Sequence, residues 1–267
     1  METKQRIGAK IAMYGALTFL LIIWIYPIYL AVSKSLSIGG VGNYSAVLNH
    51  NVFNYWQAVG NSLTMAGTSA LMIMLLSSLG GYAFSKLRFT GRKVIYNLLL
   101  ACLAVPIASV VTPLFFTINN LGLRDTYLGV IIPMIGFNVL MMLMLMKNHF
   151  DTLPDELIEA ATLDGAGTFR TFWQILMPLS GASLANVGVL SFVYSWNEYL
   201  LPTLLIKSPE KFPVTQAISL LQFDRMSQEQ IAQLYAGLIL MTIPSVLVYL
   251  FSQRYLQSGL TAGAVKS

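Results

Sequence analysis

The chain has 267 residues, of which 56% are hydrophobic and only 10% are charged, and its mean hydropathy is +0.67. These values lie outside the usual range of soluble domains, so the composition predicts a membrane protein. The formal charge of +5 does not indicate nucleic-acid binding, because the basic residues lie between apolar runs and form no stripe. The single cysteine, Cys102, excludes an intrachain disulfide and is expected to be a small buried apolar residue.

Six apolar segments are long enough to cross a bilayer, which takes roughly 20 residues of helix. They are residues 11–33, 61–84, 94–118, 127–146, 179–205 and 231–252. Pro106 and Pro113 interrupt the interior of the third segment, Pro133 that of the fourth and Pro244 that of the sixth. Because neighbouring helices can satisfy the freed carbonyls in a membrane, we expect kinks there rather than breaks. The sequence therefore predicts an all-α membrane protein with six transmembrane helices, forming one domain over residues 1–267.

Lysine and arginine are divided unequally between the two sides that these spans define, with eleven on one side and five on the other. Basic residues are enriched on the cytoplasmic side of membrane proteins. Both termini, the loop 150–178 and the tail 253–267 are therefore predicted to be cytoplasmic, and the loop 207–230 to be periplasmic. The basic N-terminus could also begin a signal peptide, but its apolar run exceeds the roughly 7 to 15 residues of such peptides.

The cytoplasmic loop contains an unusually polar stretch, EAATLDGAGTFRTFWQILMP, over residues 159–178. Five of the chain's eleven acids lie in or just before it: Asp151, Asp155, Glu156, Glu159 and Asp164. A helix is predicted over residues 154–163, with an apolar stripe formed by Leu157, Ile158, Ala161 and Leu163. Gly165 then supplies a turn, and Thr168 can cap a second helix that leads to Pro178.

This loop resembles the EAA loop of the integral membrane subunits of bacterial ABC importers. The resemblance lies in Glu159-Ala160-Ala161, then Gly165, Ile175 and Pro178, and it is greatest for the maltose-type carbohydrate permeases. Met177 departs mildly from that pattern, which usually has leucine there. Residues 196–199 (WNEY), 253–255 (QRY) and 259–266 (GLTAGAVK) agree with it as well. The resemblance implies a type I ABC importer permease fold and a subunit of an ATP-driven, binding-protein-dependent importer of sugars or oligosaccharides in the bacterial cytoplasmic membrane.

The resemblance also implies partners: a second permease, two ABC ATPase subunits, a solute-binding protein and membrane lipid, but no nucleic acid. Coupling to the ATPase would use Glu159, Ala160, Ala161, Asp164, Gly165, Ala166 and Pro178, and the tail would add Gly259, Leu260, Thr261 and Gly263. No GxxxxGK[ST] motif occurs in the sequence, so the chain is expected to be no enzyme and to bind no cofactor, with ATP and Mg in the partner subunits. The alternative for the loop is a hairpin lying on the membrane surface, but such helices are normally basic.

Glu198 is the only acid within the six predicted spans, and a charge at membrane depth usually faces a cavity or a partner. The candidate pore or gate residues are Tyr194, Trp196, Asn197 and Glu198. Their alternative roles are an interfacial carboxylate near water and an aromatic belt. By resemblance, the loop 207–230 would present Thr215, Gln216 and Phe223 to the binding protein, although it could equally form a structural cover over the pore.

Three competing interpretations are open to test. An ion-coupled secondary transporter would need ionisable residues near the midplane and often repeated spans, which are not evident. An intramembrane enzyme would need a catalytic motif such as HExxH, which the sequence lacks. No metal site is expected, because His50 and His149 have no Asp, Glu or Cys companions at ligand spacing. A non-sugar solute such as glycerol phosphate is the alternative within the same family.

Overall fold

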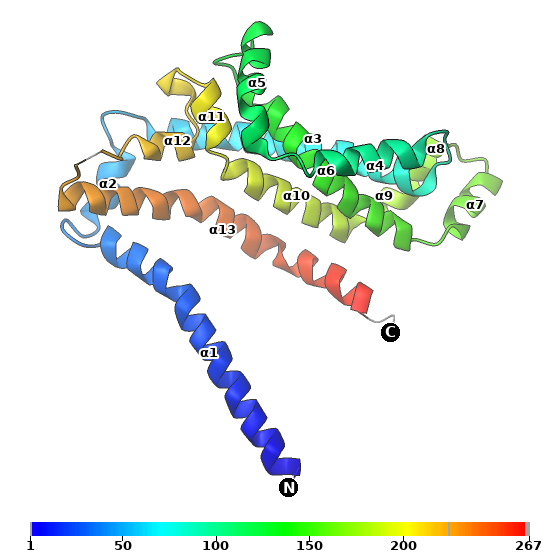
Figure 1. The fold of residues 1–267 in the computed structure, drawn as a ribbon, viewed down its shortest axis with the longest axis horizontal. Coiled ribbons are helices and arrows are strands. Elements are labelled where there is room, and N and C mark those ends of the chain that lie inside the picture. The colour runs from blue at the N-terminus through cyan, green and yellow to red at the C-terminus, as the bar shows by residue number, and fades with distance from the viewer. Residues whose placement is uncertain (1, 224, 265–267) are drawn as a thin grey trace. The chain divides into compact units, whose positions relative to one another are not determined.

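The computed structural model describes residues 2–223 and 225–264, and within these residues all regular structure is helical (Figure 1). The chain divides into two compact units. The first contains Met1–Tyr55 and Ile218–Ile243, and the second contains Trp56–Ala217 and Pro244–Ser267. The prediction of an all-α chain is confirmed within the described residues.

The first unit contains α1 (Glu2–Ser35), α2 (Gly42–Leu48) and the first part of the long helix α13 (Gln228–Ala264). Nearly all the described apolar side chains of α1 are exposed, as lipid-facing side chains would be. After α1, Asn43 closes the turn because its amide donates to the carbonyls of Ser35 and Ile38 at 2.9 and 3.0 Å.

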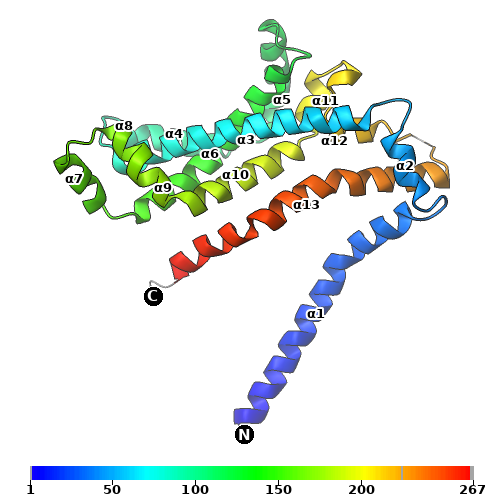
Figure 2. The same cartoon turned by 180° about the vertical axis from the view of Figure 1, so that it is seen from behind.

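The second unit holds the second part of α13 and the remaining elements, except that Tyr55 of α3 and Ile218 and Ser219 of α12 belong to the first unit. The remaining elements are α3 (Tyr55–Lys86), α4 (Arg92–Cys102), α5 (Ile107–Asn120), α6 (Tyr127–Thr152), α7 (Glu156–Leu163), α8 (Thr168–Thr171), a π-helical turn (Phe172–Leu176), α9 (Met177–Leu179), α10 (Gly181–Trp196), α11 (Leu200–Leu205), a 3₁₀ turn (Pro209–Lys211) and α12 (Val214–Ser219). Figures 1 and 2 show α3, α6 and α10 side by side, with α7 at one end of the unit and α11 and α12 at the other.

The core of the second unit lies where α3, α6, the π-helical turn and α10 meet. Its buried side chains are Ile73, Tyr82, Met142, Met146, Phe150, Phe172, Leu176 and Val187. Methionine is unbranched and polarizable, and it fills the irregular spaces between crossing helices. The π-helical turn contributes Phe172 and Leu176, so the polar loop is packed onto the helix bundle through its second half.

Four helical segments among the described residues are long and apolar enough to cross a membrane: Met13–Ser35, Tyr55–Lys86, Tyr127–Thr152 and Gln228–Gln253. The two other predicted spans are bent, by 98° between α4 and α5 and by 83° between α9 and α10. The number of spans is therefore four, or up to six if each bent pair crosses once.

Proline breaks the helix at one of the four predicted positions. Pro113, Pro133 and Pro244 lie inside continuous helices, so they do not break them, as predicted. Pro106 stands in extended conformation between α4 and α5 and marks a break, so the prediction of a kink was wrong there. Proline disfavours helical conformation in the residue before it, and the helix restarts after it. Cys102, at the end of α4, is exposed rather than buried, contrary to expectation.

Candidate functional site

The helix predicted over residues 154–163 is present as α7, with Asp155 at its N-cap position and Glu156 and Glu159 in its first turn. Carboxylates there interact favourably with the positive end of the helix dipole. The structured helix begins two residues later than predicted, because Pro154 stands before the helix instead of at its first position.

The two faces of α7 differ in exposure. Leu157 and Ile158 are half-buried, Ala161 is 4% exposed, and Ile158 packs against the core of the second unit. Glu159 and Ala160 are exposed, and Leu163 is 89% exposed. Leu163 was therefore wrongly assigned to the buried stripe. The two adjacent alanines lie on different faces of α7. Ala161 permits close packing onto the bundle, and Ala160 leaves the exposed face without a large side chain at its position.

The turn after α7 depends on Gly165, whose φ is +76°. The Ala166 N–H donates to the Ala161 carbonyl at 2.8 Å, and the Gly165 N–H donates to the Thr162 carbonyl at 3.0 Å. These two bonds form the glycine-based motif that satisfies the last carbonyls of a helix. A Cβ at Gly165 would meet no atom within 4 Å, so the requirement for glycine comes from the backbone angle.

The second half of the loop is less regular than predicted. Gly167, and not Thr168, holds the N-cap position of α8 and makes no side-chain cap bond, so the expected Thr168 cap was wrong. Pro178 is exposed within α9, immediately before the 83° bend. At the bend, the buried Ser180 hydroxyl donates to the Leu176 carbonyl at 2.7 Å and lies 3.1 Å from His149 Nε2.

Ionic contacts fix the entry to α7 onto the neighbouring helices. Lys86 Nζ, at the end of α3, donates to the Asp155 carboxylate at 2.5 Å and to the Leu153 carbonyl at 2.7 Å, and the Lys86 side chain is 6% exposed. The Asp151 carboxylate accepts from Ser85 Oγ and from Lys147 Nζ, both at 2.6 Å. Helix α7 is therefore bound at its start to α3, and the end of α3 is in turn bound to the end of α6.

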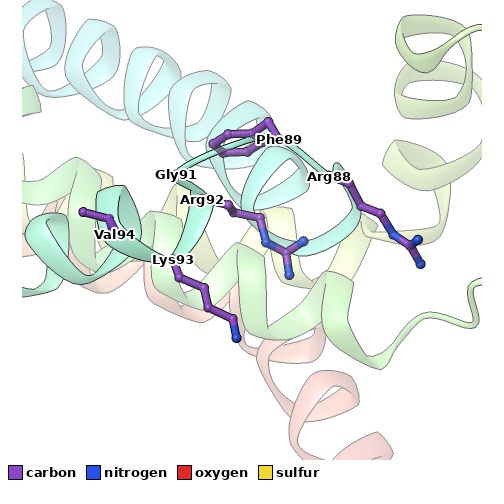
Figure 3. Close-up of a pocket in the computed structure, with 6 residues that line it drawn as sticks. All are labelled: Arg88, Phe89, Gly91, Arg92, Lys93 and Val94. Atoms are coloured by element: carbon purple, nitrogen blue, oxygen red, sulfur yellow. The ribbon is translucent and has the colours of Figure 1, made fainter.

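A basic cavity of about 390 Å³ lies at the turn between α3 and α4 (Figure 3). Its lining residues are Arg88, Phe89, Gly91, Arg92, Lys93 and Val94, and in Figure 3 the three cationic side chains extend away from the Phe89 ring. An adjoining cavity of about 300 Å³ shares Arg88 and Arg92 and reaches Asp155 and Glu159. The surface beside α7 thus carries charges of both signs. From the sequence, these cations were expected only to set which side of the membrane the loop occupies.

The four candidate pore residues differ in burial and in the contacts that they make. Trp196 is 1% exposed and stacks on Phe192, with ring centroids 5.7 Å apart, so it offers no free face to a solute. Tyr194 and Asn197 are exposed. The Glu198 carboxylate accepts from the Leu201 N–H at 3.1 Å and so satisfies one of the free N–H groups in the first turn of α11.

Two of the three residues expected to face a binding protein are buried, contrary to expectation. The Thr215 hydroxyl donates to the Glu198 carbonyl at 2.9 Å, and the Gln216 amide to the Ile206 carbonyl at 3.4 Å. Both side chains hold α12 in place and are not presented on the surface. Phe223 is exposed.

The predicted tail contacts lie at the end of α13, whose backbone is helical as far as Ala264. For Gly259, Leu260, Thr261 and Gly263 the structure describes the backbone alone, so the predicted contacts lie outside the part of the chain that it describes. Among the described residues, no three His, Cys, Asp or Glu side chains are grouped so that they could hold a metal ion.

Sequence reasoning missed Asp125, in the turn between α5 and α6. Its carboxylate accepts hydrogen bonds from the Ser208 hydroxyl, from the N–H groups of Ser208 and Lys207, and from Lys211 Nζ. These donors, the Ser208 hydroxyl first, hold the pKa of the Asp125 carboxyl well below its usual range. No spacing pattern could reveal this group, because its partners lie more than 80 residues away along the chain.

The lowered pKa of the Asp125 carboxyl predicts how residues 206–212 respond to acid. An acid whose pKa falls on folding stabilises the fold fully above its unfolded pKa of about 3.9, and the contribution is lost as the pH falls toward the lower folded value. We therefore expect the amide protection of residues 206–212 to stay constant from about pH 7 to pH 5 and to fall only below about pH 4. Hydrogen–deuterium exchange, corrected for the intrinsic rate, measures this. Loss of protection between pH 7 and pH 5 would contradict the assignment.

Comparison with known proteins identifies the family. The model of the family described as "Binding-protein-dependent transport system inner membrane component" matches residues 73–262, which is more than half of the chain. The chain belongs to this family. It is a permease subunit of an ABC importer and not a catalytic enzyme, which confirms the resemblance seen in the EAA loop.

Three relatives of this permease illustrate the match. The maltodextrin transport system permease protein MdxG of Bacillus subtilis is 31% identical over 271 residues, covering 96% of each chain. The sn-glycerol-3-phosphate transport system permease protein UgpE of Yersinia enterocolitica is 35% identical over 221 residues, covering 83% of this permease and 75% of the relative. The fold is similar to a chain in the crystal structure of a bacterial ABC transporter involved in the import of the acidic polysaccharide alginate. The TM-score is 0.80 at 23% sequence identity, and the match covers 94% of this permease and 97% of that chain. This last similarity gives the permease the type I ABC importer fold.

Proposed function

We propose that this permease serves an ATP-driven, binding-protein-dependent importer of sugars or oligosaccharides in the bacterial cytoplasmic membrane. The observation that carries the proposal is the match to MdxG, a permease named for maltodextrin transport, over 96% of both chains. The chain would form half of the translocation path and a second permease the other half. Each bent helix pair would cross the membrane once, giving six spans with both termini in the cytoplasm.

Within this proposal, α7 is the coupling helix that seats on an ABC ATPase subunit. Its outer face offers Glu159, Ala160 and Leu163 to a partner, and Asp164, Gly165 and Ala166 form the slim turn beside it. Ala161 and the Lys86–Asp155 pair hold the helix against the bundle, and the segment through Pro178 leads into α10. A helix attached in this way moves with α3, α6 and α10. Closure of the ATPases would therefore displace the spans, and ATP and Mg would stay in the partner subunits.

We extend the proposal to other contacts of the permease. Tyr194, Asn197 and Glu198 would lie beside the translocation path, because they surround the break between α10 and α11. Phe223, which is exposed, would face the solute-binding protein. The tail, with Gly259, Leu260, Thr261 and Gly263, would contact the ATPase pair.

Glycerol phosphate is the second candidate solute, because UgpE is a permease named for sn-glycerol-3-phosphate transport. The deciding experiment measures which solutes raise the melting temperature of the solute-binding protein that co-purifies with this permease. Maltodextrins, disaccharides and sn-glycerol-3-phosphate should be compared. The uptake into proteoliposomes of whichever solute raises this melting temperature is then measured. We expect an oligosaccharide to stabilise the binding protein and to be taken up only with ATP. Stabilisation by sn-glycerol-3-phosphate alone would favour the second candidate, and uptake driven by an ion gradient without ATP would exclude an ABC importer.

A further inference from the structure

Asp125 has an unusual backbone conformation for its residue type. Its φ is +58°, and among the described residues it is the only non-glycine residue with a positive φ. Such a conformation persists only when the surrounding contacts enforce it, and aspartate tolerates it better than most residues do. The Asp125 N–H donates to the Leu205 carbonyl at 2.9 Å, which joins this turn to the end of α11.

The side chain of Asp125 binds the segment that follows α11. Oδ1 accepts from the N–H groups of Lys207 and Ser208, both at 3.0 Å, while Oδ2 accepts from the Ser208 hydroxyl and, at 3.2 Å, from Lys211 Nζ. Lys211 Nζ also donates to the Asp125 carbonyl at 2.7 Å. A charged carboxylate makes stronger hydrogen bonds than a neutral acceptor does, and this one residue binds three residues of the segment: Lys207, Ser208 and Lys211.

A second polar anchor holds the far end of the same segment. The buried Asn61 amide, on α3, donates to the Glu210 and Phe212 carbonyls at 2.8 and 3.0 Å. Tyr127, at the start of α6, donates its hydroxyl proton to Asn61 Oδ1 at 2.8 Å, which orients the amide. Residues 207–212 are therefore fixed at both ends while Lys207, Pro209 and Glu210 stay exposed.

This fixed segment lies at the end of the second unit opposite to α7 (Figure 2). Loops that bind partners gain affinity when they are ordered in advance, and this segment is held at both ends with Lys207, Pro209 and Glu210 exposed. We propose that Asp125 is a positioning residue that presets residues 207–212 as a contact surface for the solute-binding protein. This inference rests on the proposed function, because it needs α7 to face the ATPase and the opposite end to face the binding protein.

The test compares Asp125→Gly with Asp125→Asn in the complete transporter complex. Glycine adopts the positive φ freely and removes the carboxylate, so the backbone turn is kept. Asparagine also tolerates this φ and keeps one acceptor for the Lys207 and Ser208 amides, but it loses the charge. Two quantities are measured: hydrogen–deuterium exchange of residues 206–212 in the absence of the solute-binding protein, and ATPase activity as a function of the concentration of the co-purified solute-binding protein.

For Asp125→Gly we expect faster exchange in residues 206–212. The binding-protein concentration for half-maximal stimulation should rise about fivefold, with the maximal rate unchanged, because only the ordering of the surface is lost. Asp125→Asn should recover part of both effects.

Unchanged exchange overturns the anchoring role, and faster exchange with an unchanged half-maximal concentration overturns the positioning role. A lower maximal rate alone indicates a merely structural residue. If the wild-type complex does not respond to the binding protein while exchange still rises in Asp125→Gly, the proposed function fails and the anchor itself stands.

Discussion

Replacing Ala160 by arginine is expected to lower ATP-driven solute uptake by the reconstituted complex more than about tenfold. Ala160 lies on the exposed face of α7, so the substitution disturbs no contact within the permease. In the assembled transporter the long cationic side chain would prevent close approach of the ATPase or would be buried against it without a partner. Uptake into proteoliposomes and co-purification of the ATPase subunits measure the effect together.

Two substitutions serve as controls for Ala160→Arg. Ala160→Ser keeps a small side chain and should retain uptake. Ala161→Leu enlarges the neighbouring alanine, which is buried, and should instead lower the melting temperature of the permease because it overpacks the contact between α7 and the bundle. If Ala160→Arg supports normal uptake with the ATPases still bound, α7 is not the coupling helix.

The sequence predicted this helix well because its signals are local. Apolar spacing, acids in the first turn and a glycine after the last turn act within a few residues, and α7 ends at Leu163 as expected. The apolar spacing also placed Ala161 on the inner face, where the structure buries it. It placed Leu163 there too, but Leu163 is 89% exposed. The ion pair that fixes Asp155 comes from Lys86, on another helix about 70 residues earlier, and no local pattern indicates it.

Several features that the sequence did not predict depend on distant contacts. The break at Ser180 and the π-helical turn before it are stabilised by His149 on α6 and by the packing of Phe172 in the core. Trp196 is of a residue type common in pores and aromatic belts, yet the fold buries it. Thr215 was predicted to face a partner, but its hydroxyl donates to the Glu198 carbonyl within the chain. An apolar pattern identifies a span but does not reveal where it bends or which polar side chains the fold itself requires.

Replacing Gly81 by alanine should destabilise the permease by about 1–3 kcal/mol, the usual cost of overpacking. A Cβ at this position of α3 would lie 2.8 Å from the Lys147 backbone nitrogen and 2.8 Å from Met146 Cβ on α6. A backbone atom cannot turn aside as a side chain can, so α3 and α6 would have to separate. Thermal unfolding of the purified permease in detergent should show a melting temperature lower by several degrees.

The adjacent glycine supplies the matched control. At Gly80 the nearest atom to an added Cβ is Leu143 Cδ1, at 2.5 Å, which is the end of a flexible side chain that can rotate away. Alanine also favours helix over glycine by about 1 kcal/mol, which offsets part of the cost. Gly80→Ala should therefore destabilise much less than Gly81→Ala, and equal effects would show that the backbones of α3 and α6 are not in close contact. Because Ser85 and Lys86 at the end of the same helix bind Asp151 and Asp155, Gly81→Ala should also loosen the attachment of α7, and protection of residues 156–163 from hydrogen exchange should fall with stability.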